Sequence, residues 1–221
     1  MTELHVVRVL ASDHVPGSGG LVGIVLAGEE IDPADRQAIA ARRGLPEIVF
    51  VDDRNRGAVR VHTPTRERPY AGYPFLGAAW LLHQHGWPVD ALACHAVSVS
   101  IRCTEADAYM TIPTSWCSAV TLQEVDTVAE LRAIQPQPDS VVRWSWDHRR
   151  ERCVVTQCTI PDHPPGEGIS ASVAAAVGAA VGPPVEVELG GGSVAHVLSG
   201  NKAGHLVGGS VSLEHVEPIR H

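Results

Sequence analysis

Glu47 is an acidic residue in a stretch of the chain that is otherwise apolar. It follows Pro46 and precedes the strand-like run Ile48-Val49-Phe50-Val51. Apolar surroundings would raise the pKa of the Glu47 carboxyl group, because burial disfavours the charged form, and would let it accept and return a proton near neutral pH. The alternative is an exposed glutamate at the start of a strand. The residues alone leave both interpretations open.

A second candidate region is the Gly/Pro loop that opens a helix predicted at residues 74–85. Residues 75–82 are almost all apolar or small, which is typical of a helix buried inside protein, and Pro74 suits a first helical turn. Such a helix start offers backbone N–H groups and partial positive charge to a carboxylate. Gly72 and Tyr73 lie at this opening. Tyr73 is either a hydrogen-bond or proton donor or an aromatic ring that packs in a filled site.

The second half of the chain repeats this arrangement with a small-residue helix predicted at residues 169–181. Glu167, in the loop before it, is either a second acid or substrate anchor, or a solvated loop residue. Ser170 and Ser172 either cap and pack the helix or contact a ligand carboxylate. Each half therefore has strands, a Pro/Gly loop, an apolar helix and more strands.

The order of these elements predicts an α+β fold. The strands come in runs and do not alternate strictly with helices, which argues against a doubly wound sheet. We expect two pseudo-repeated lobes, 1–113 and 114–221, each a mixed sheet around a central apolar helix. The boundary falls within 90–138, and the terminal strand can cross over. A shorter helix begins at Asp32-Pro33 and ends at Gly44.

Composition narrows the class of protein. The formal charge of −8 argues against nucleic acid or an anionic membrane as partner. The N-terminus lacks a basic start and an apolar run, so we expect a cytoplasmic protein whose five cysteines are reduced, mostly small buried side chains. We expect no metal, because no His/Cys set has ligand spacing. The glycines at 17–20 miss the dinucleotide-binding pattern, and residues 168–172 miss that of a serine hydrolase.

Two segments resemble the phenazine-biosynthesis PhzF-like family, which shares the diaminopimelate-epimerase fold. Residues 45–51, Leu-Pro-Glu-Ile-Val-Phe-Val, are similar to that family's Leu-Ser-Glu-Thr-x-Phe-Val. Residues 63–79 resemble its signature Thr-Pro-x-x-Glu-x-Pro-Phe-Ala-Gly-His-Pro-Thr-x-Gly-Ala-Ala. In the second half, residues 167–172 match its Asp-Pro-Val-Thr-Gly-Ser in position more than in identity. The resemblance spans nearly the whole chain, with the second half shortened.

The resemblance implies roles for the candidate residues. The family glutamate, here Glu47, is the general acid/base that moves a proton on a small cyclic substrate. Tyr73 replaces the family histidine that positions substrate, and Glu167 replaces the family aspartate. Gly20 lies in Gly19-Gly20-Leu21, which replaces the family's Gly-Asn-Pro and removes a polar group from the site. Gly72, Gly20, Ser170 and Ser172 would surround the substrate. No cysteine lies near Tyr73 or Ser170, so the two-thiol racemisation of the epimerases is not expected.

The expected function is therefore a cofactor-independent isomerase of a small carboxylated metabolite in specialised metabolism, working in a cleft between the lobes. One alternative is a cyclase that uses the same cleft. Another is a catalytically degenerate member that binds a small molecule or a partner protein. A homodimer is implied by the resemblance alone.

Overall fold

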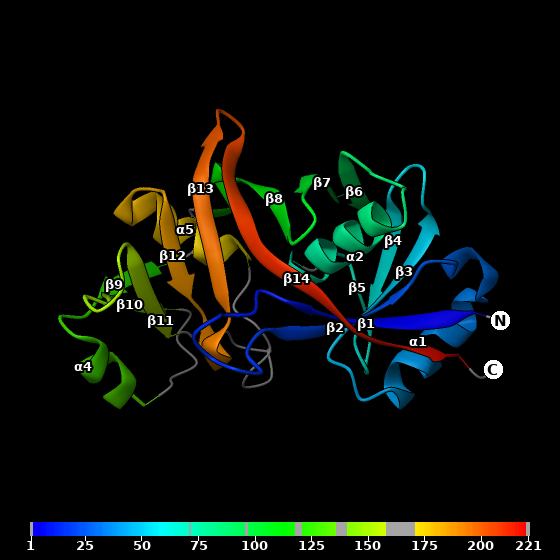
Figure 1. The fold of residues 1–221 in the computed structure, drawn as a ribbon, viewed down its shortest axis with the longest axis horizontal. Helices are drawn as coiled ribbons and strands as arrows, with labels where there is room; N and C mark the ends of the chain where they lie inside the picture. Colours follow the sequence, from blue (N-terminus) through cyan, green and yellow to red (C-terminus); the bar gives the residue numbers. More distant parts are fainter. Residues whose placement is uncertain are drawn as a thin grey trace. The chain divides into compact units, whose positions relative to one another are not determined.

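The computed structural model describes residues 2–70, 72–95, 97–117, 121–135, 141–157 and 171–219. Within these ranges the chain is strand-rich α+β, as the sequence predicts (Figure 1). The helices are η1 (Gly28–Glu30), α1 (Pro33–Arg42), α2 (Gly72–Gln84), α3 (Thr114–Cys117), α4 (Val128–Ala133), α5 (Ala171–Val181) and η2 (Gly190–Gly192). The strands are β1 (Glu3–Val9), β2 (Gly20–Val25), β3 (Ile48–Asp53), β4 (Ala58–His62), β5 (Glu67–Arg68), β6 (Ala91–Cys94), β7 (Val97–Cys103), β8 (Asp107–Pro113), β9 (Thr121–Glu124), β10 (Val141–Trp146), β11 (Cys153–Gln157), β12 (Val185–Glu188), β13 (Val194–Asn201) and β14 (Gly204–Pro218).

The chain divides into two compact units that exchange short segments. The N-terminal unit comprises Met1–Val9, Gly20–Met110 and Ser210–His221, and the C-terminal unit comprises Leu10–Gly19 and Thr111–Gly209. The end of β14 joins the N-terminal unit by antiparallel pairing with β1, from Glu3↔Pro218 to Val9↔Val211. The last strand of the chain therefore completes the sheet that the first strand begins.

The N-terminal unit contains a mixed sheet. Its strands lie in the order β1-β2-β3-β4-β6-β7-β8, and the end of β14 pairs with β1 at one edge of this series. The short strand β5 pairs with the end of β4. The pairs β2–β3 and β4–β6 are parallel, whereas β14–β1, β1–β2, β3–β4, β4–β5, β6–β7 and β7–β8 are antiparallel. Strand pairing of both senses is a property of the α+β class and fits strands that arrive in runs.

Helix α2 packs against β1, β2, β3 and β7. Its residues Gly72 and Pro74–Leu82 are all buried, as expected for a helix that is apolar on every side. Gly77 marks the closest approach to the sheet. A Cβ atom at this position would lie 2.8 Å from Val7 Cγ2 and 3.1 Å from Val9 Cγ2. The missing side chain lets the helix approach β1.

The opposite face of this sheet carries α1. Asp32 caps the helix by accepting a hydrogen bond from the Ala34 N–H at 2.9 Å, and Pro33 follows at the first position. Helix α1 contributes Ile39 and Ala40 to an apolar cluster that also includes alternate residues of β1 and β3. Its members are Leu4, Val6, Val25, Ile31, Ile39, Ala40, Ile48, Phe50 and Ile219.

The C-terminal unit contains the strand order β14-β13-β12-β11-β10-β9. Strands β10 and β11 form an antiparallel hairpin and pair from Arg143↔Gln157 to Trp146↔Val154. Helix α5 packs against β12, β13 and α3. A Cβ atom on Gly178 would lie 2.5 Å from Val197 Cγ1, so a small residue is also needed where α5 meets its sheet.

Four cysteine thiols in the described ranges are free. Cys94 and Cys153 are buried, and Cys103 and Cys117 are partly buried, while Cys158 lies outside these ranges. No helix that the structure describes is long and apolar enough to cross a membrane.

Candidate functional site

Glu47 lies at the point where β2 and β3 begin to run in parallel. It is the residue before β3, and its carbonyl oxygen accepts a hydrogen bond from the Gly23 N–H at 3.0 Å. The residue is only 4% exposed. An exposed glutamate at a strand start, the alternative that the sequence left open, is therefore wrong.

Strand register shows that the Glu47 side chain lies on the face of the sheet that carries α2. Ile24 contacts the position of Gly77 in α2, and Ile24 pairs with Val49 across β2 and β3. Side chains alternate along a strand, so Glu47, two residues before Val49, shares the side of Val49. Ile48 and Phe50 belong to the cluster beneath α1 on the other side.

Arg68 in β5 forms an ion pair with Glu47. Arg68 Nη1 lies 3.3 Å from Glu47 Oε1, and the two side chains are 22% and 5% exposed. Strand β4 brings the two residues together, because Val61 pairs with Val49 on one side and with Arg68 on the other. Residues opposite one another share a face, so Val49, Val61 and Arg68 lie in one row on the α2 side.

This ion pair changes the electrostatic surroundings expected for Glu47. Along the sequence, Glu47 is followed by the apolar residues 48–50. The structure adds a guanidinium group, and burial and an adjacent cation act in opposite directions, since burial disfavours the ionised carboxylate and the cation stabilises it. Arg68 was missed because nothing in the sequence predicts a two-residue strand that pairs with β4.

Tyr73 lies against Gly20 on the same face of the sheet. A Cβ atom on Gly20 would lie 2.9 Å from Tyr73 Cε2 and 3.3 Å from Cδ2, so the ring occupies the space that a side chain at position 20 would fill. Val22 stands beside Glu47, because Gly23 pairs with Ile48 in the parallel register. Gly20 lies two residues before Val22 on that face.

The structure therefore brings four predicted site residues to one region of the N-terminal unit. Glu47 precedes β3, Gly20 begins β2, buried Gly72 begins α2, and half-buried Tyr73 follows it. Arg68 joins them from β5. An acid, a guanidinium and a phenol at the start of a buried helix could bind a small anion and transfer a proton.

Tyr70 is also close to this helix start, but it is engaged in packing. Its hydroxyl group donates to Met110 Sδ at 3.7 Å, and its ring packs edge-to-face on Phe75 with centroids 5.4 Å apart. Burial raises the pKa of Tyr70 well above its ordinary value, so the phenol stays protonated throughout the neutral range.

The remaining predicted site residues belong to the second half of the chain. Ser172 is the second residue of α5 in the C-terminal unit and is half-buried. Glu167 and Ser170 lie outside the described residues.

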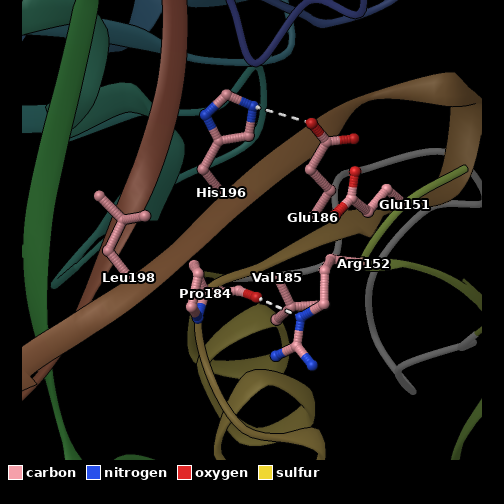
Figure 2. A pocket seen from close by; sticks show the side chains of 7 residues that line it. All are labelled: Glu151, Arg152, Pro184, Val185, Glu186, His196 and Leu198. Atoms are coloured by element: carbon pink, nitrogen blue, oxygen red, sulfur yellow. Dashed lines mark hydrogen bonds and ion pairs between the residues drawn. The ribbon is translucent and has the colours of Figure 1, made fainter.

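Two cavities of the C-terminal unit are lined by other described residues, and Ser172 is not among these. Figure 2 shows one of about 330 Å³ beside the β12–β13 pair, lined by Glu151, Arg152, Pro184, Val185, Glu186, His196 and Leu198. His196 Nε2 lies 3.9 Å from Glu186 Oε1, while Arg152 Nε donates to the Pro184 carbonyl oxygen at 2.9 Å. The other, of about 310 Å³, is lined by Thr127, Val128, Ala129, Arg132, Trp146, Asp147, His148 and Arg149. Among the described residues, no group of three His, Cys, Asp or Glu side chains could hold a metal ion.

Comparison with known proteins adds sequence and structural relatives. Residues 9–131 match the family model of PhzC-PhzF, phenazine biosynthesis-like protein. A trans-2,3-dihydro-3-hydroxyanthranilate isomerase of Pseudomonas fluorescens is 39% identical over 74 residues, which is 32% of this chain and 27% of that relative. The chain thus matches less than a third of the length of this curated relative.

Solved structures show the same fold over the whole chain. A structure named for a phenazine biosynthesis PhzC/PhzF protein of Clostridium difficile strain 630 superimposes with a TM-score of 0.78 at 13% identity, covering 100% of both chains. A phenazine biosynthesis protein of the PhzF family from Enterococcus faecalis gives a TM-score of 0.75 at 15% identity, covering 97% of both chains.

Proposed function

Because this chain belongs to the phenazine biosynthesis-like PhzC-PhzF family, we propose that it is an isomerase that moves a proton on a small carboxylated metabolite. Glu47 is the proton-transferring group in this proposal. The observation that carries it is the position of Glu47, which is 4% exposed, faces α2 and contacts the Arg68 guanidinium. A buried acid beside a helix start and a cation is suited to general acid–base chemistry on an anion.

The proposed step is redox-neutral and needs no cofactor. The Glu47 carboxylate takes a proton from a C–H group of the substrate, and the electron pair of that bond enters the conjugated system of the substrate. The protonated Glu47 then returns the proton to another carbon, so that one C–H bond breaks, one forms and a double bond moves. A substrate carboxylate would help to delocalise the charge that develops between these two transfers.

The substrate class is proposed from both the site and a relative. The Pseudomonas fluorescens relative is named for a hydroxylated dihydroanthranilate, which is a ring that bears a carboxylate. In this chain the start of α2 at Gly72 offers backbone N–H groups to such an anion. Glu167, Ser170 and Ser172 are proposed to hold the substrate from the C-terminal unit, and Gly20 to border it, as the family resemblance implies. A cyclisation on the same residues is a variant of this proposal.

Solvent deuterium exchange tests the proposal. The full chain in D₂O should exchange a C–H proton of cyclic carboxylates that resemble dihydroanthranilates. Glu47→Gln removes the proton acceptor with little change in shape and should abolish exchange, a loss of at least about 100-fold for a general acid–base group. Glu67→Gln is the matched control, because Glu67 neighbours Arg68 in β5 but is exposed and contacts His95 at 2.9 Å. Exchange that survives Glu47→Gln would rule out this residue.

A second candidate function is non-catalytic binding of a small molecule or a partner protein. The contact of the Tyr73 ring with the Gly20 position favours it, because the ring fills the space that a side chain at position 20 would occupy. Saturable binding of a cyclic carboxylate, measured by calorimetry, without exchange of any of its C–H protons would support this candidate.

We also propose that the protein acts in the cytoplasm as a homodimer. The dimer rests on the family resemblance, and sedimentation equilibrium would test it directly. A monomer at micromolar concentration would contradict it.

A further inference from the structure

An ion pair between Arg68 and Glu47 joins β5 to the start of β3. Arg68 occupies the variable position between the glutamate and the proline of the signature Thr-Pro-x-x-Glu-x-Pro, which residues 63–69 resemble. The signature itself therefore does not call for a cation here. The fold nevertheless places Arg68 Nη1 3.3 Å from the carboxylate of the residue to which the proposed function assigns proton transfer.

We propose that Arg68 is a positioning residue that keeps Glu47 ionised in the resting site, so that Glu47 begins the reaction as a base and can accept an anionic substrate beside it. This inference rests on the proposed function. A buried carboxylate without a counter-ion tends to take up a proton, and a second carboxylate nearby strengthens that tendency. The Arg68 guanidinium opposes both effects.

The elements around Glu47 limit which groups can compete with Arg68 for this role. Strand β2 has no titratable side chain, whereas α2 contributes the phenol of Tyr73 at its start and the imidazole of His83 in its last turn. In β4, His62 and Arg60 pair with Ile48 and Phe50 and therefore lie on the α1 face. In β5, Glu67 pairs with His62 on that same opposite face. Of the two arginines on β4 and β5, Arg60 lies on the α1 face and Arg68 on the α2 face.

The environment of the pair supports a role beyond stability. Glu47 is almost completely buried, and the Arg68 side chain is 22% exposed, so the pair lies at the border between the core and solvent. Buried ion pairs contribute little net stability, because desolvation offsets the Coulombic attraction.

The direct test is the titration of Glu47 itself. The full chain is labelled with ¹³C at glutamate carboxyl groups, and the Glu47 signal is identified by its loss in Glu47→Gln. In the wild type this signal should report an ionised carboxylate at pH 7. In Arg68→Met, whose side chain is apolar and of similar length, the titration midpoint should rise by at least one pH unit, a tenfold change in the ionisation constant. Arg68→Lys should recover part of this shift.

The control is Arg66→Met, which removes an exposed arginine from the same segment and should leave the midpoint unchanged. If Arg68→Met does not fold, Arg68→Gln removes the charge while keeping hydrogen-bond donors, and it should show the same upward shift. A protonated Glu47 in the wild type at pH 7 would overturn the inference. An unchanged midpoint in a folded, uncharged Arg68 variant would overturn it as well.

Exchange kinetics separate this inference from the proposed function. In Arg68→Met the acid limb of the pH profile of kcat/KM should move to higher pH by the amount of the NMR shift. If the Glu47 titration is shifted in Arg68→Met but neither the wild type nor any variant catalyses exchange, the proposed isomerase activity is contradicted. The role of Arg68 as the counter-ion of Glu47 is then still supported. If Arg68→Met still catalyses exchange and the acid limb of its pH profile is not shifted, the proposed role of Arg68 is contradicted, whereas the proposed isomerase activity is supported.

Discussion

Two tyrosines flank the start of α2, and their rings have different neighbours. Tyr70 donates to Met110 Sδ and packs on Phe75, so its phenol is part of the core. Tyr73 is half-buried, and its ring lies over Gly20 on the face that carries Glu47. We propose Tyr73, of these two tyrosines, as a donor to the substrate, in place of the family histidine.

We predict that Tyr73→Phe lowers the rate of deuterium exchange by about 100-fold, the lower range for loss of a proton or hydrogen-bond donor at a reacting group. Tyr70→Phe should leave exchange unchanged and cost at most about 1 kcal/mol of stability, because one weak hydrogen bond is lost. Exchange rates and urea unfolding of both variants check this prediction. Equal exchange rates in Tyr73→Phe and the wild type would mean that Tyr73 only packs.

At the scale of elements, close packing of α2 on β1 positions the start of the helix. The helix approaches β1 at Gly77, where a Cβ atom would lie 2.8 Å from Val7 Cγ2. Gly72 and Tyr73 lie on the first turn of the same helix, one turn before Gly77. A shift of α2 away from the sheet would therefore also move the residues proposed to meet the substrate.

We predict that Gly77→Ala destabilises the protein, although alanine is favoured over glycine in a helix by about 1 kcal/mol. The added methyl group overpacks a buried contact, which typically costs about 1–3 kcal/mol. Urea unfolding should show a lower midpoint for Gly77→Ala than for the wild type. Gly190→Ala, where a Cβ atom meets nothing within 4 Å, is the control and should leave the midpoint nearly unchanged. A stabilised Gly77→Ala would show that the helix accommodates the methyl group.

At the scale of the whole molecule, two buried histidines connect stability to pH. Burial lowers the pKa of His5 and of His62 below the ordinary value, and His85 adds to the effect at His5. Both imidazoles are therefore neutral in the folded protein near pH 7. His62 Nδ1 lies 3.1 Å from Gln37 Oε1, and its ring packs edge-to-face on Phe50.

We predict that the free energy of unfolding falls as the pH drops below about 6.5, where histidines of the unfolded chain take up protons. Because the pKa values of His5 and His62 are lowered in the folded state, the unfolded state binds more protons at these pH values. The difference stops growing once the pH falls below the lowered pKa of the folded state. Each histidine contributes a slope of at most about 1.4 kcal/mol per pH unit.

Urea unfolding at pH 7.5 and pH 5.5 measures this difference. His62→Gln should lose less stability between the two values than the wild type does, and His148→Gln, on an exposed turn, should match the wild type. Identical losses in His62→Gln and the wild type would contradict the assignment to His62.

The α+β class and the positions of its main helices could be predicted from the sequence because they depend on local patterns. The apolar stretch at 75–82 and the Asp32-Pro33 cap specify helices through burial and capping, whatever surrounds them. Glu47 stood out for a similar reason, as a charge between a proline and a buried strand. Its burial and its face could not be predicted, because both depend on the register of β3 with β2 and β4.

The amino-acid sequence by itself thus determined the α+β class, the main helices and which residues could carry proton chemistry. Only the tertiary structure decided that Arg68 is the partner of Glu47, that the Tyr73 ring covers Gly20 and that residues 210–218 complete the first sheet. The physical reason is the separation along the chain over which each kind of interaction acts. Propensity and capping act within a few residues, whereas strand pairing between β1 and β14 joins positions at opposite ends of the chain, and no local pattern records such a contact.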